Sequence, residues 1–414
     1  MRRAFDIRLK IAGFSDKIQI INRKRGHKMK PVRTFFQQTA IKALLKAEKP
    51  VFDITKGSHA KNLFLSSVPY EYVGSDVKII KETDTATYIA KFNPDGSFFD
   101  GDFKIMNATD MHLDEDYALN DKTYTMLVKQ IRDEKPDLVI FTGDVILSKY
   151  QQIDAIQFAE MMERIGVYWA YVFGNHEARA EKEYFKYLIM KSLTDYPHCL
   201  TKFGDPSLFG YGNFIINIMK NESELRESLV LFDSGRDICE PHITNNNIPR
   251  DMHGYDYIKP NQIRWFEKEI QALKDEYGSA PSMLYMHIPI PEYKAVFTEN
   301  ENGTFSPSGK AEILYGEQYE SVGCSPYNSG LFEAMKRNGS QAIFAGHDHV
   351  NDFAALYEGI WLVYNQCGGY NCYTMGEYRD YNWDEMDWQQ GVTLTLLHSD
   401  GSFTLDRRFN AKYL

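Results

Sequence analysis

Five short polar motifs in this chain contain residue types that bind metal ions. They are Asp110-Met111-His112, Gly143-Asp144, Gly174-Asn175-His176-Glu177, His287 and Gly346-His347-Asp348-His349. Carboxylate, amide and imidazole groups without thiolates suit Mn, Fe or Zn, and these groups are numerous enough for two ions. The motifs therefore predict a dinuclear metal centre.

Each motif alone is a modest signal. Asp110 and Asp144 could serve ordinary turns, and a single histidine such as His287 is more often a satisfied core residue. The motifs at 174–177 and 346–349 are more specific. The prediction depends on all five motifs occurring in order, each directly after an apolar segment. Gly143, Gly174 and Gly346 are expected to let the backbone turn tightly beside a metal.

The apolar segments before the motifs are expected to be β-strands. They cover residues 103–106, 138–141, 167–173, 283–286 and 342–345. In open α/β sheets, sites form outside the carboxyl ends of the strands, so we expect the five motifs to meet in one crevice.

Helical patterns alternate with these strands. We expect a helix capped by Asn120 or Asp121, and further helices at 154–164, 260–277 and 329–337, with another strand at 228–232. The strand-helix-strand-helix-strand order from residue 103 to 173 predicts an α/β architecture with largely buried strands.

Two β-hairpins are expected at the ends of this region. One joins 87–92 to 97–107 through the turn at 93–96, and the other joins 391–397 to 402–409 through Asp400-Gly401. We interpret residues 1–83 as a basic N-terminal extension and lead-in, and residues 84–414 as one domain.

The charges are distributed unevenly along the chain. The formal net charge is −10, but residues 1–49 contain fourteen Lys or Arg and three acidic residues, which leaves −21 for the remainder. An acidic remainder disfavours nucleic acid as a partner. The basic segment is either an arm for an acidic surface, or its residues 1–28 are a poorly ordered extension or precede the true start at Met29.

The cysteine content favours a reducing compartment. The five cysteines are an odd number, are scattered and form no C-x-x-C pair, so we expect reduced thiols and a cytoplasmic location. Charged residues interrupt the first twenty positions, so no export signal is expected. No apolar run approaches the roughly 18 residues that a membrane-spanning helix requires.

The five motifs resemble those of the calcineurin-like metallophosphoesterase superfamily. Its pattern of D-x-H, G-D, G-N-H-[DE], H and G-H-x-H is complete between about residues 103 and 408. Segments 255–265 and 287–293 look like the purple-acid-phosphatase-related branch. The resemblance implies an α/β fold, a four-layer αββα sandwich. Leu147 stands where the purple enzymes have a metal-binding tyrosine, and His112 replaces a glycine, so a purple tyrosine-to-iron site is not implied.

The resemblance also implies roles for individual residues. The first metal would be held by Asp110, His112, Asp144 and His349, and the second by Asp144, Asn175, His287 and His347. Asp144 would bridge two divalent or trivalent ions, and a bridging hydroxide would attack phosphorus in line. His176 would protonate the leaving group. Glu177 and Asp348 would either orient imidazoles or be solvated turn residues.

Three functions stay open from the sequence. The leading one is a dinuclear metal-dependent phosphohydrolase acting on a phosphomonoester or phosphodiester of a small soluble molecule. The alternatives are a catalytically weak binding scaffold with the same fold, and a nuclease of the same superfamily. Segments 179–260 and 369–388 flank the expected site, and their aromatic residues would stack a base or sugar, or fill a local core. In the second segment these include Tyr378, Tyr381, Trp383 and Trp388.

Overall fold

The computed structural model describes residues 72–148, 150–177, 183–238, 252–374 and 389–413. Chain contacts divide the protein into two units, Met1–Ser67 and Val68–Leu414, and all described residues belong to the second. The basic segment 1–49 and the four aromatic residues at 378–388 lie outside these ranges. Within them, every helix is too short or too polar to cross a membrane.

The larger of two main sheets has nine strands. In spatial order they are β1 (Val77–Glu82), β2 (Ala86–Lys91), β6 (Phe214–Asn221), β7 (Glu224–Leu231), β8 (Ser282–Tyr285), β12 (Ser340–Ala345), β14 (Ile360–Tyr364), β13 (Asp352–Tyr357) and β11 (Glu312–Glu317). The strands that lead to the expected site, β8 and β12, are parallel neighbours at its centre.

The smaller main sheet has five strands. In spatial order they are β16 (Phe403–Phe409), β15 (Gly391–Leu397), β3 (Phe103–Ala108), β4 (Leu138–Thr142) and β5 (Tyr168–Val172). The short strands β9 (Phe297–Glu299) and β10 (Phe305–Pro307) form a separate pair. The described ranges also contain two 3₁₀ helices, η1 (Pro291–Ala295) and η3 (Asn410–Tyr413).

The two main sheets pack face to face through an apolar layer. Ile105 and Ile140 of the five-stranded sheet belong to the same buried cluster as Leu229 and Phe344 of the nine-stranded sheet. Residues that alternate with these along the strands face the helices instead, because successive side chains of a strand point to opposite faces.

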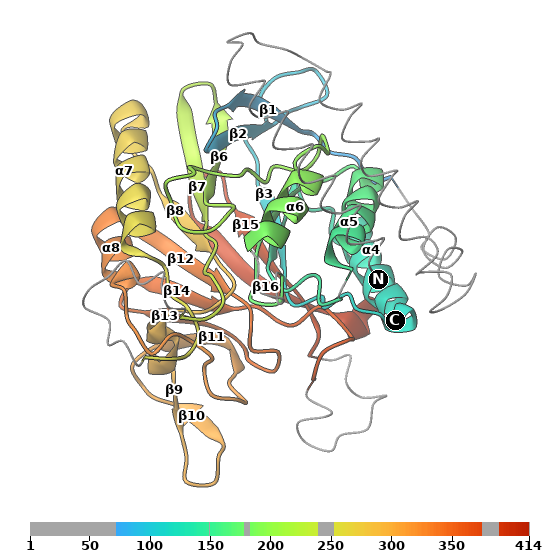
Figure 1. The fold of residues 1–414 in the computed structure, drawn as a ribbon. Coiled ribbons are helices and arrows are strands. Elements are labelled where there is room, and N and C mark those ends of the chain that lie inside the picture. Colours follow the sequence, from blue (N-terminus) through green and yellow to red (C-terminus); the bar gives the residue numbers. More distant parts are fainter. Residues whose placement is uncertain (1–71, 149, 178–182, 239–251, 375–388, 414) are drawn as a thin grey trace. The chain divides into compact units, whose positions relative to one another are not determined.

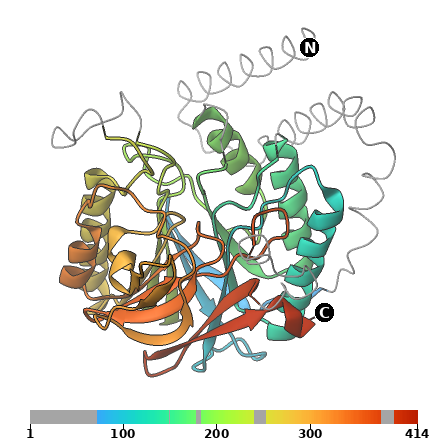
Figure 2. The same cartoon turned by 90° about the horizontal axis from the view of Figure 1, so that it is seen from below.

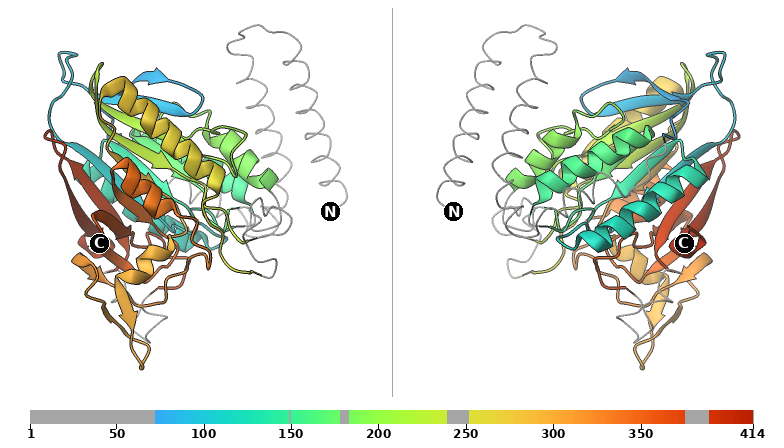
Figure 3. Two further views of the ribbon diagram at one scale, coloured as in Figure 1. Left: turned by 90° about the vertical axis from the view of Figure 1, so that its left-hand side faces the viewer. Right: turned by 90° about the vertical axis from the view of Figure 1, so that its right-hand side faces the viewer.

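Helices cover the outer face of each sheet. On the five-stranded side lie α4 (Tyr117–Glu134) and α5 (Gln151–Ile165), with α6 (Glu183–Leu193) beside α5. On the nine-stranded side lie α7 (Pro260–Tyr277) and α8 (Leu331–Asn338) (Figure 1). Phe158 of α5 contacts Phe141 of β4 edge to face, with ring centroids 4.8 Å apart. The strands lie between the two helical layers in Figure 2, and each panel of Figure 3 shows one layer. The predicted four-layer αββα sandwich is confirmed.

Several predicted elements are confirmed in detail. Strands β3, β4 and β5 are parallel neighbours joined by α4 and α5, as the alternating pattern predicted. Helix α7 has the predicted bounds. The C-terminal hairpin pairs β15 with β16 from Gly391↔Phe409 to Leu397↔Phe403, and Gly401 in its turn has a φ of 87°.

The predicted N-terminal hairpin is wrong. Strand β2 pairs with β1 and β6 in the nine-stranded sheet, whereas β3 belongs to the five-stranded sheet. The turn itself forms, since Ser97 N–H donates to Asp95 Oδ1 at 2.9 Å, but only an isolated bridge, Phe92↔Phe98, follows it. After this turn the chain crosses to the other sheet. Strand β1, at Val77–Glu82, lies before the expected boundary at residue 84.

The predicted cap of the first helix is also wrong. Helix α4 begins at Tyr117, and the Asp116 side chain accepts hydrogen bonds from the backbone N–H groups of Ala118 and Leu119. Asn120 instead donates from its side chain to the carbonyl oxygen of Asp114 at 2.7 Å. Aspartate and asparagine both favour the N-cap position, and the earlier residue, Asp116, is the cap in the structure.

Candidate metal centre

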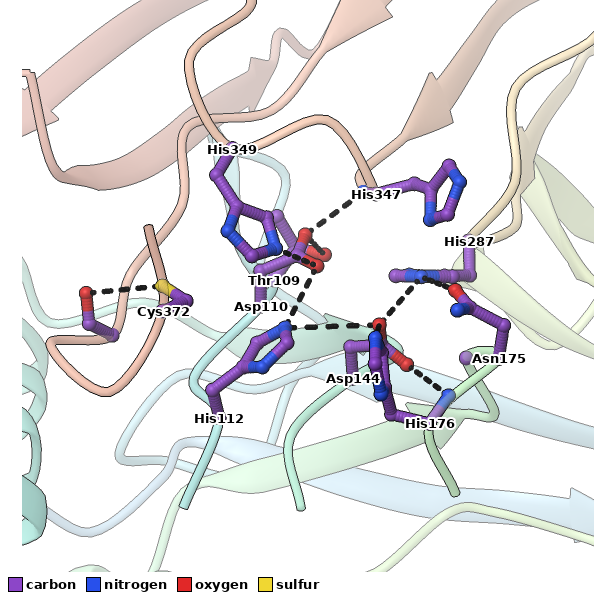
Figure 4. Close-up of polar contacts among 12 residues, drawn as sticks. Thr109, Asp110, His112, Asp144, Asn175, His176, His287, His347, His349 and Cys372 are labelled. Atoms are coloured by element: carbon purple, nitrogen blue, oxygen red, sulfur yellow. Dashed lines mark hydrogen bonds and ion pairs between the residues drawn. The ribbon is translucent and has the colours of Figure 1, made fainter. Parts of the chain in front are cut away.

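The five motifs converge at the carboxyl ends of five strands that come from both sheets (Figure 4). The five-stranded sheet supplies Asp110 and His112 after β3, Asp144 after β4, and Asn175 and His176 after β5. The nine-stranded sheet supplies His287 after β8, and His347 and His349 after β12. Every residue predicted for the site is therefore brought to one place.

The first group of potential ligands consists of Asp110, His112 and His349. One ligand atom from each lies within 4.8 Å of the others, and all three residues are buried. Asp110 Oδ1 is 3.5 Å from Nε2 of His112 and 3.5 Å from Nε2 of His349. These three residues are the ligands predicted for the first metal, apart from Asp144, which was predicted to be shared by both metals.

The second group consists of Asp144, His287 and His347, again with ligand atoms within 4.8 Å of one another. Nε2 of His287 lies 3.1 Å from Asp144 Oδ2 and 2.9 Å from Asn175 Oδ1. Asn175 and Asp144 therefore both contact Nε2 of His287. Together these four residues are the set predicted for the second metal.

Asp144 lies between the two groups. Its Oδ2 atom is 3.1 Å from Nε2 of His287 in one group and 3.7 Å from Nε2 of His112 in the other. This is the position that a bridging ligand requires, although the bridging role itself stays a prediction.

Backbone contacts fix the orientation of two of the imidazoles. Nδ1 of His287 is 2.8 Å from the carbonyl oxygen of Thr142, and Nδ1 of His349 is 3.1 Å from that of Tyr373. Because a carbonyl oxygen only accepts hydrogen bonds, Nδ1 is the donor in both rings. The Nε2 atoms are thereby directed at the carboxylates, as in metal sites where the second ring nitrogen is hydrogen-bonded.

The buried polar atoms of the site fit cations. Among the described residues, Asp110 Oδ1, His112 Nε2 and His347 Nε2 are buried without a hydrogen-bond partner. Such unsatisfied groups are rare in folded proteins because burying them costs free energy. A cation beside them would supply the missing interaction.

The electrostatics of the site also favour positive charge. Burial by itself lowers the pKa of an imidazole, and with the nearby His287 it lowers that of His347 to about 3. At His287 the carboxylates of Asp144 and Asp110 outweigh burial and raise the pKa to about 9. At His349 the contact with Asp110 outweighs burial and raises the pKa to about 10. The buried carboxylates therefore hold protons on these two rings when no cation is present.

Backbone strain is concentrated at the site. Asp110, His112, Asp144 and His347 have positive φ angles of 51°, 46°, 49° and 85°. Such angles cost a non-glycine residue about 1–3 kcal/mol and are found mainly where the surrounding structure enforces them. Hydrogen bonds do so here: Asp110 N–H donates to the carbonyl oxygen of Gly143 at 3.1 Å, and His347 N–H to Asp110 Oδ2 at 2.9 Å.

The glycines of the motifs serve two different purposes. Only Gly143 has a positive φ, of 87°, so the prediction of tight turning is right for this residue alone. A Cβ atom on Gly174 would lie 2.1 Å from Asp144 Oδ1, and one on Gly346 would lie 2.6 Å from Asp110 Oδ2. These two glycines are needed because the space of a side chain is occupied by the Asp144 carboxylate at position 174, and by the Asp110 carboxylate together with the Thr109 hydroxyl, 2.1 Å away, at position 346.

Glu177 neither orients an imidazole nor faces solvent, so that prediction is wrong. Its carboxylate is fully buried and accepts five hydrogen bonds, from the backbone N–H groups of Asp144, Val145, Ile146 and Gly174 and from the hydroxyl of Tyr171, at 2.6–3.1 Å. Glu177 thus joins the turn after β4 to the turn after β5.

Asp348 is likewise a buried acceptor, which joins its turn to two neighbouring segments and is not a partner of an imidazole. Its Oδ2 accepts from the backbone N–H of Gly323 at 2.7 Å and from the hydroxyl of Tyr364. Burial, reinforced by the nearby charge of Glu320, raises the pKa of this carboxyl to about 7. The predicted role for Asp348 is therefore wrong as well.

His176 belongs to neither group of three. Its backbone N–H donates to Asp144 Oδ1 at 2.8 Å, and its Nε2 lies 3.7 Å from Asp144 Oδ2. Its side chain is 28% exposed, whereas that of Asp144 is 1% exposed. An imidazole beside the carboxylates but open to solvent is placed to exchange protons, and its role as a proton donor stays a prediction.

Two tyrosines beside the site were not predicted individually. The ring of Tyr373 stacks on His349 with centroids 4.1 Å apart, and that of Tyr255 contacts His347 edge to face at 4.3 Å. Both are more than one-third exposed. They lie in the two segments expected to flank the site, which was the available signal.

Comparison with known proteins identifies the family. A sequence model of the calcineurin-like phosphoesterase family matches residues 103–351, which is more than half of the chain. The chain belongs to this family, as its motifs predicted.

Its relatives include proteins of the predicted branch. The chain is 28% identical over 312 residues to "Probable inactive purple acid phosphatase 29" of Arabidopsis thaliana, covering 66% of this chain and 73% of that protein. It is 28% identical over 296 residues to "Phosphatase DCR2" of Saccharomyces cerevisiae, covering 65% of this chain and 48% of that protein. A solved dimetal phosphatase from Danio rerio aligns with a TM-score of 0.44 and 13% identity, covering 74% of this chain and 96% of that chain.

Proposed function

We propose that this protein is a dinuclear metal-dependent phosphohydrolase that cleaves a phosphomonoester or phosphodiester of a small molecule. The observation that carries this proposal is the position of Asp144 between two buried groups of ligands, each completed by imidazoles from the other sheet. A single carboxylate placed between two such groups favours a pair of cations over one.

The residues fit Mn, Fe or Zn. The first ion would be held by Asp110, His112, Asp144 and His349, and the second by Asp144, Asn175, His287 and His347. When bound, two such ions supply Lewis acidity that screens the charge of a phosphate and lowers the pKa of a water nucleophile.

The remaining chemistry comes from the side chains. Although their burial opposes it, the adjacent imidazoles hold the pKa of Asp110 and Asp144 well below the usual range, so both are anionic ligands at neutral pH. The strained turns fix these carboxylates before a substrate arrives, which avoids a cost of ordering them during the reaction. His176 gives a proton from its imidazole to the leaving oxygen, and solvent can reprotonate it.

A binding scaffold is the main alternative. The word "inactive" in the name of the Arabidopsis relative concerns that protein. It nevertheless shows that turnover has to be measured for this chain. A scaffold would have no need of His176 beside the carboxylates or of a complete set of ligands. A nuclease is disfavoured by the net charge of −21 outside residues 1–49. From the five scattered cysteines, which form no C-x-x-C pair, we propose a cytoplasmic location.

A screen of the metal-loaded protein tests the proposal. The protein is reconstituted separately with Mn, Fe and Zn and assayed on phosphomonoesters, phosphodiesters and nucleotides, with Asp144→Asn as the matched control. We expect hydrolysis of at least one class, absent in the control and removed by chelation. A protein that binds two ions but hydrolyses none of these esters would be a scaffold.

A further inference from the structure

A pair of thiols lies next to the first group of ligands. Cys367 follows β14, and its Sγ atom is 3.0 Å from that of Cys372. Both Sγ atoms also lie 3.7 Å from the carbonyl oxygen of Gly369. Cys372 appears in Figure 4 on the side of His112 and His349, and ligand atoms of His349 and both cysteines lie within 4.8 Å of one another.

The segment that carries these thiols is attached to the backbone of the first ligand turn. Gly368 N–H donates to the carbonyl oxygen of Thr109 at 2.9 Å, and Gly369 N–H to that of Asp110 at 3.1 Å. The Cys367 thiol also donates to the Asp110 carbonyl, at 3.2 Å. The next residue after Cys372 is Tyr373, whose ring stacks on His349. A change in the thiols would therefore disturb both Asp110 and His349, which belong to the same group of ligands.

We propose that Cys367 and Cys372 are a redox-sensitive modification site that forms a reversible disulfide by exchange with a low-molecular-weight disulfide such as oxidised glutathione, and that this bond weakens cation binding by Asp110, His112 and His349. The sulfur atoms need to approach by only about 1 Å to reach the length of a disulfide bond. The bond itself does not depend on the proposed function; its effect on the cation does.

The exchange reaction balances in two steps. Cys372 is half-buried and Cys367 is buried, so the Cys372 thiolate attacks a sulfur of oxidised glutathione, whose S–S bond breaks and releases one glutathione thiolate. The Cys367 thiolate then attacks Sγ of Cys372 and displaces the second glutathione. The two thiol protons pass to the two glutathione thiolates. The protein dithiol loses two electrons, and one glutathione disulfide becomes two glutathione thiols.

A disulfide fits these contacts better than a metal ion held by the two thiols and His349. Both ring nitrogens of His349 already face other groups, since Nδ1 is 3.1 Å from the Tyr373 carbonyl oxygen and Nε2 is 3.5 Å from Asp110 Oδ1. Oxidation would remove the thiol hydrogen bond to the Asp110 carbonyl and draw in the residue beside Tyr373. Asp110 has a strained φ of 51° and depends on such contacts.

The first experiment detects the bond directly. The metal-loaded protein is incubated with reduced or oxidised glutathione, free thiols are alkylated, and peptides are mapped by mass spectrometry. We expect a Cys367–Cys372 bond that dithiothreitol reverses. Cys199 and Cys324 serve as internal controls, because burial raises the pKa of both thiols, that of Cys199 to about 12, and should leave them reduced. Failure of this bond to form, or protection of both thiols by a bound ion, would overturn the proposal.

The second experiment measures the consequence. Elemental analysis and metal titration of the oxidised protein should show one cation bound as before and the other weakened roughly tenfold, a typical effect of disturbing groups that support metal ligands. Cys372→Ser should bind both cations equally well with either form of glutathione. A disulfide that leaves both affinities unchanged would refute the link to the ligands. Neither measurement uses hydrolysis, so an absence of phosphatase activity would count against the proposed function alone.

Discussion

The carboxylate of Glu177 accepts a hydrogen bond from the backbone N–H of Asp144 at 3.1 Å, and thereby supports the residue that lies between the two groups of ligands. We expect Glu177→Gln to lower the free energy of unfolding by at least about 2 kcal/mol, because an amide nitrogen in place of either oxygen leaves two or more buried donors without an acceptor. Urea denaturation measures this loss. Tyr171→Phe, which removes one of the five donors, is the control and should cost about 1 kcal/mol. Equal effects of the two variants would contradict this role of Glu177.

Asp144→Asn should weaken both cations and lower turnover below detection, since Asp144 is the only residue shared by the two predicted ligand sets. Asp110→Asn is the matched variant and should weaken one cation only. Elemental analysis of the two purified proteins separates these outcomes. Full occupancy of one tightly bound ion in Asp144→Asn would show that Asp144 does not bridge.

Alanine at the two crowded glycines should disturb different ligands. Neither glycine has a positive φ, so alanine is compatible with their backbone angles. At position 174, however, the new Cβ atom would lie 2.1 Å from Asp144 Oδ1 and 2.4 Å from the Asp144 nitrogen, and at position 346 it would lie 2.1 Å from Thr109 Oγ1 and 2.6 Å from Asp110 Oδ2. We expect Gly174→Ala to reduce binding of both cations and Gly346→Ala to reduce mainly one. Circular dichroism confirms folding, and metal titration gives the affinities. Identical metal content in both variants and the original protein would refute the steric argument.

His176→Ala should retain both cations and lower kcat by roughly 10²- to 10⁴-fold on an alkyl phosphate, the range for loss of a general acid. The loss should be much smaller on a nitrophenyl ester, because nitrophenolate leaves without a proton. Steady-state kinetics on the two esters, with metal analysis, test this prediction. If both esters slow equally or a cation is lost, His176 has a positioning or ligand role.

Cation binding should strengthen as the pH rises. In the cation-free protein the pKa values of His287 and His349 are raised to about 9 and 10, so both rings are protonated at pH 7 and must release a proton to bind an ion. By the same shift, proton binding stabilises the cation-free fold below pH 6.5, and this stabilisation is lost as the pH rises through 9 and 10. Calorimetric titration in buffers of different ionisation enthalpy measures the proton release. A heat of binding independent of the buffer would exclude it.

The predictable elements are the strands and helices whose local sequence pattern matches the structure that they adopt in the fold. The strands before the five motifs are short apolar runs with a polar residue at the carboxyl end, and the helix at Pro260–Tyr277 begins with proline and ends before Gly278, which has a φ of 79°. The strands β6, β13 and β14 were missed although each has a hairpin partner nearby in the sequence, since β6 pairs with β7 and β13 with β14. Most of their side chains are buried, so their sequences lack the alternation of polar and apolar residues that marks a strand with one exposed face.

The site was predictable as a set of residues but not as a set of contacts. The types and order of the motifs identify Asp110 and His349, for example, although 3.5 Å between their side chains follows only from the packing of two sheets. Glu177 was misjudged because a motif shows which residue is adjacent in sequence, whereas its five donors come from three separate positions of the fold. The Cys367–Cys372 contact depends on a loop conformation that has no sequence pattern.

Each group of ligands contains residues from both sheets, which has a thermodynamic consequence. Asp110 and His112 follow a strand of one sheet and His349 follows a strand of the other, and Asp144 is likewise grouped with His287 and His347 across the layers. A bound ion therefore links the two halves of the sandwich, and an ion present at 100 times its dissociation constant adds about 2.7 kcal/mol to the free energy of unfolding. Chelation would then lower the melting temperature even of a protein with no substrate. The ligands would thus contribute to thermal stability, a role separate from the proton transfer proposed for His176.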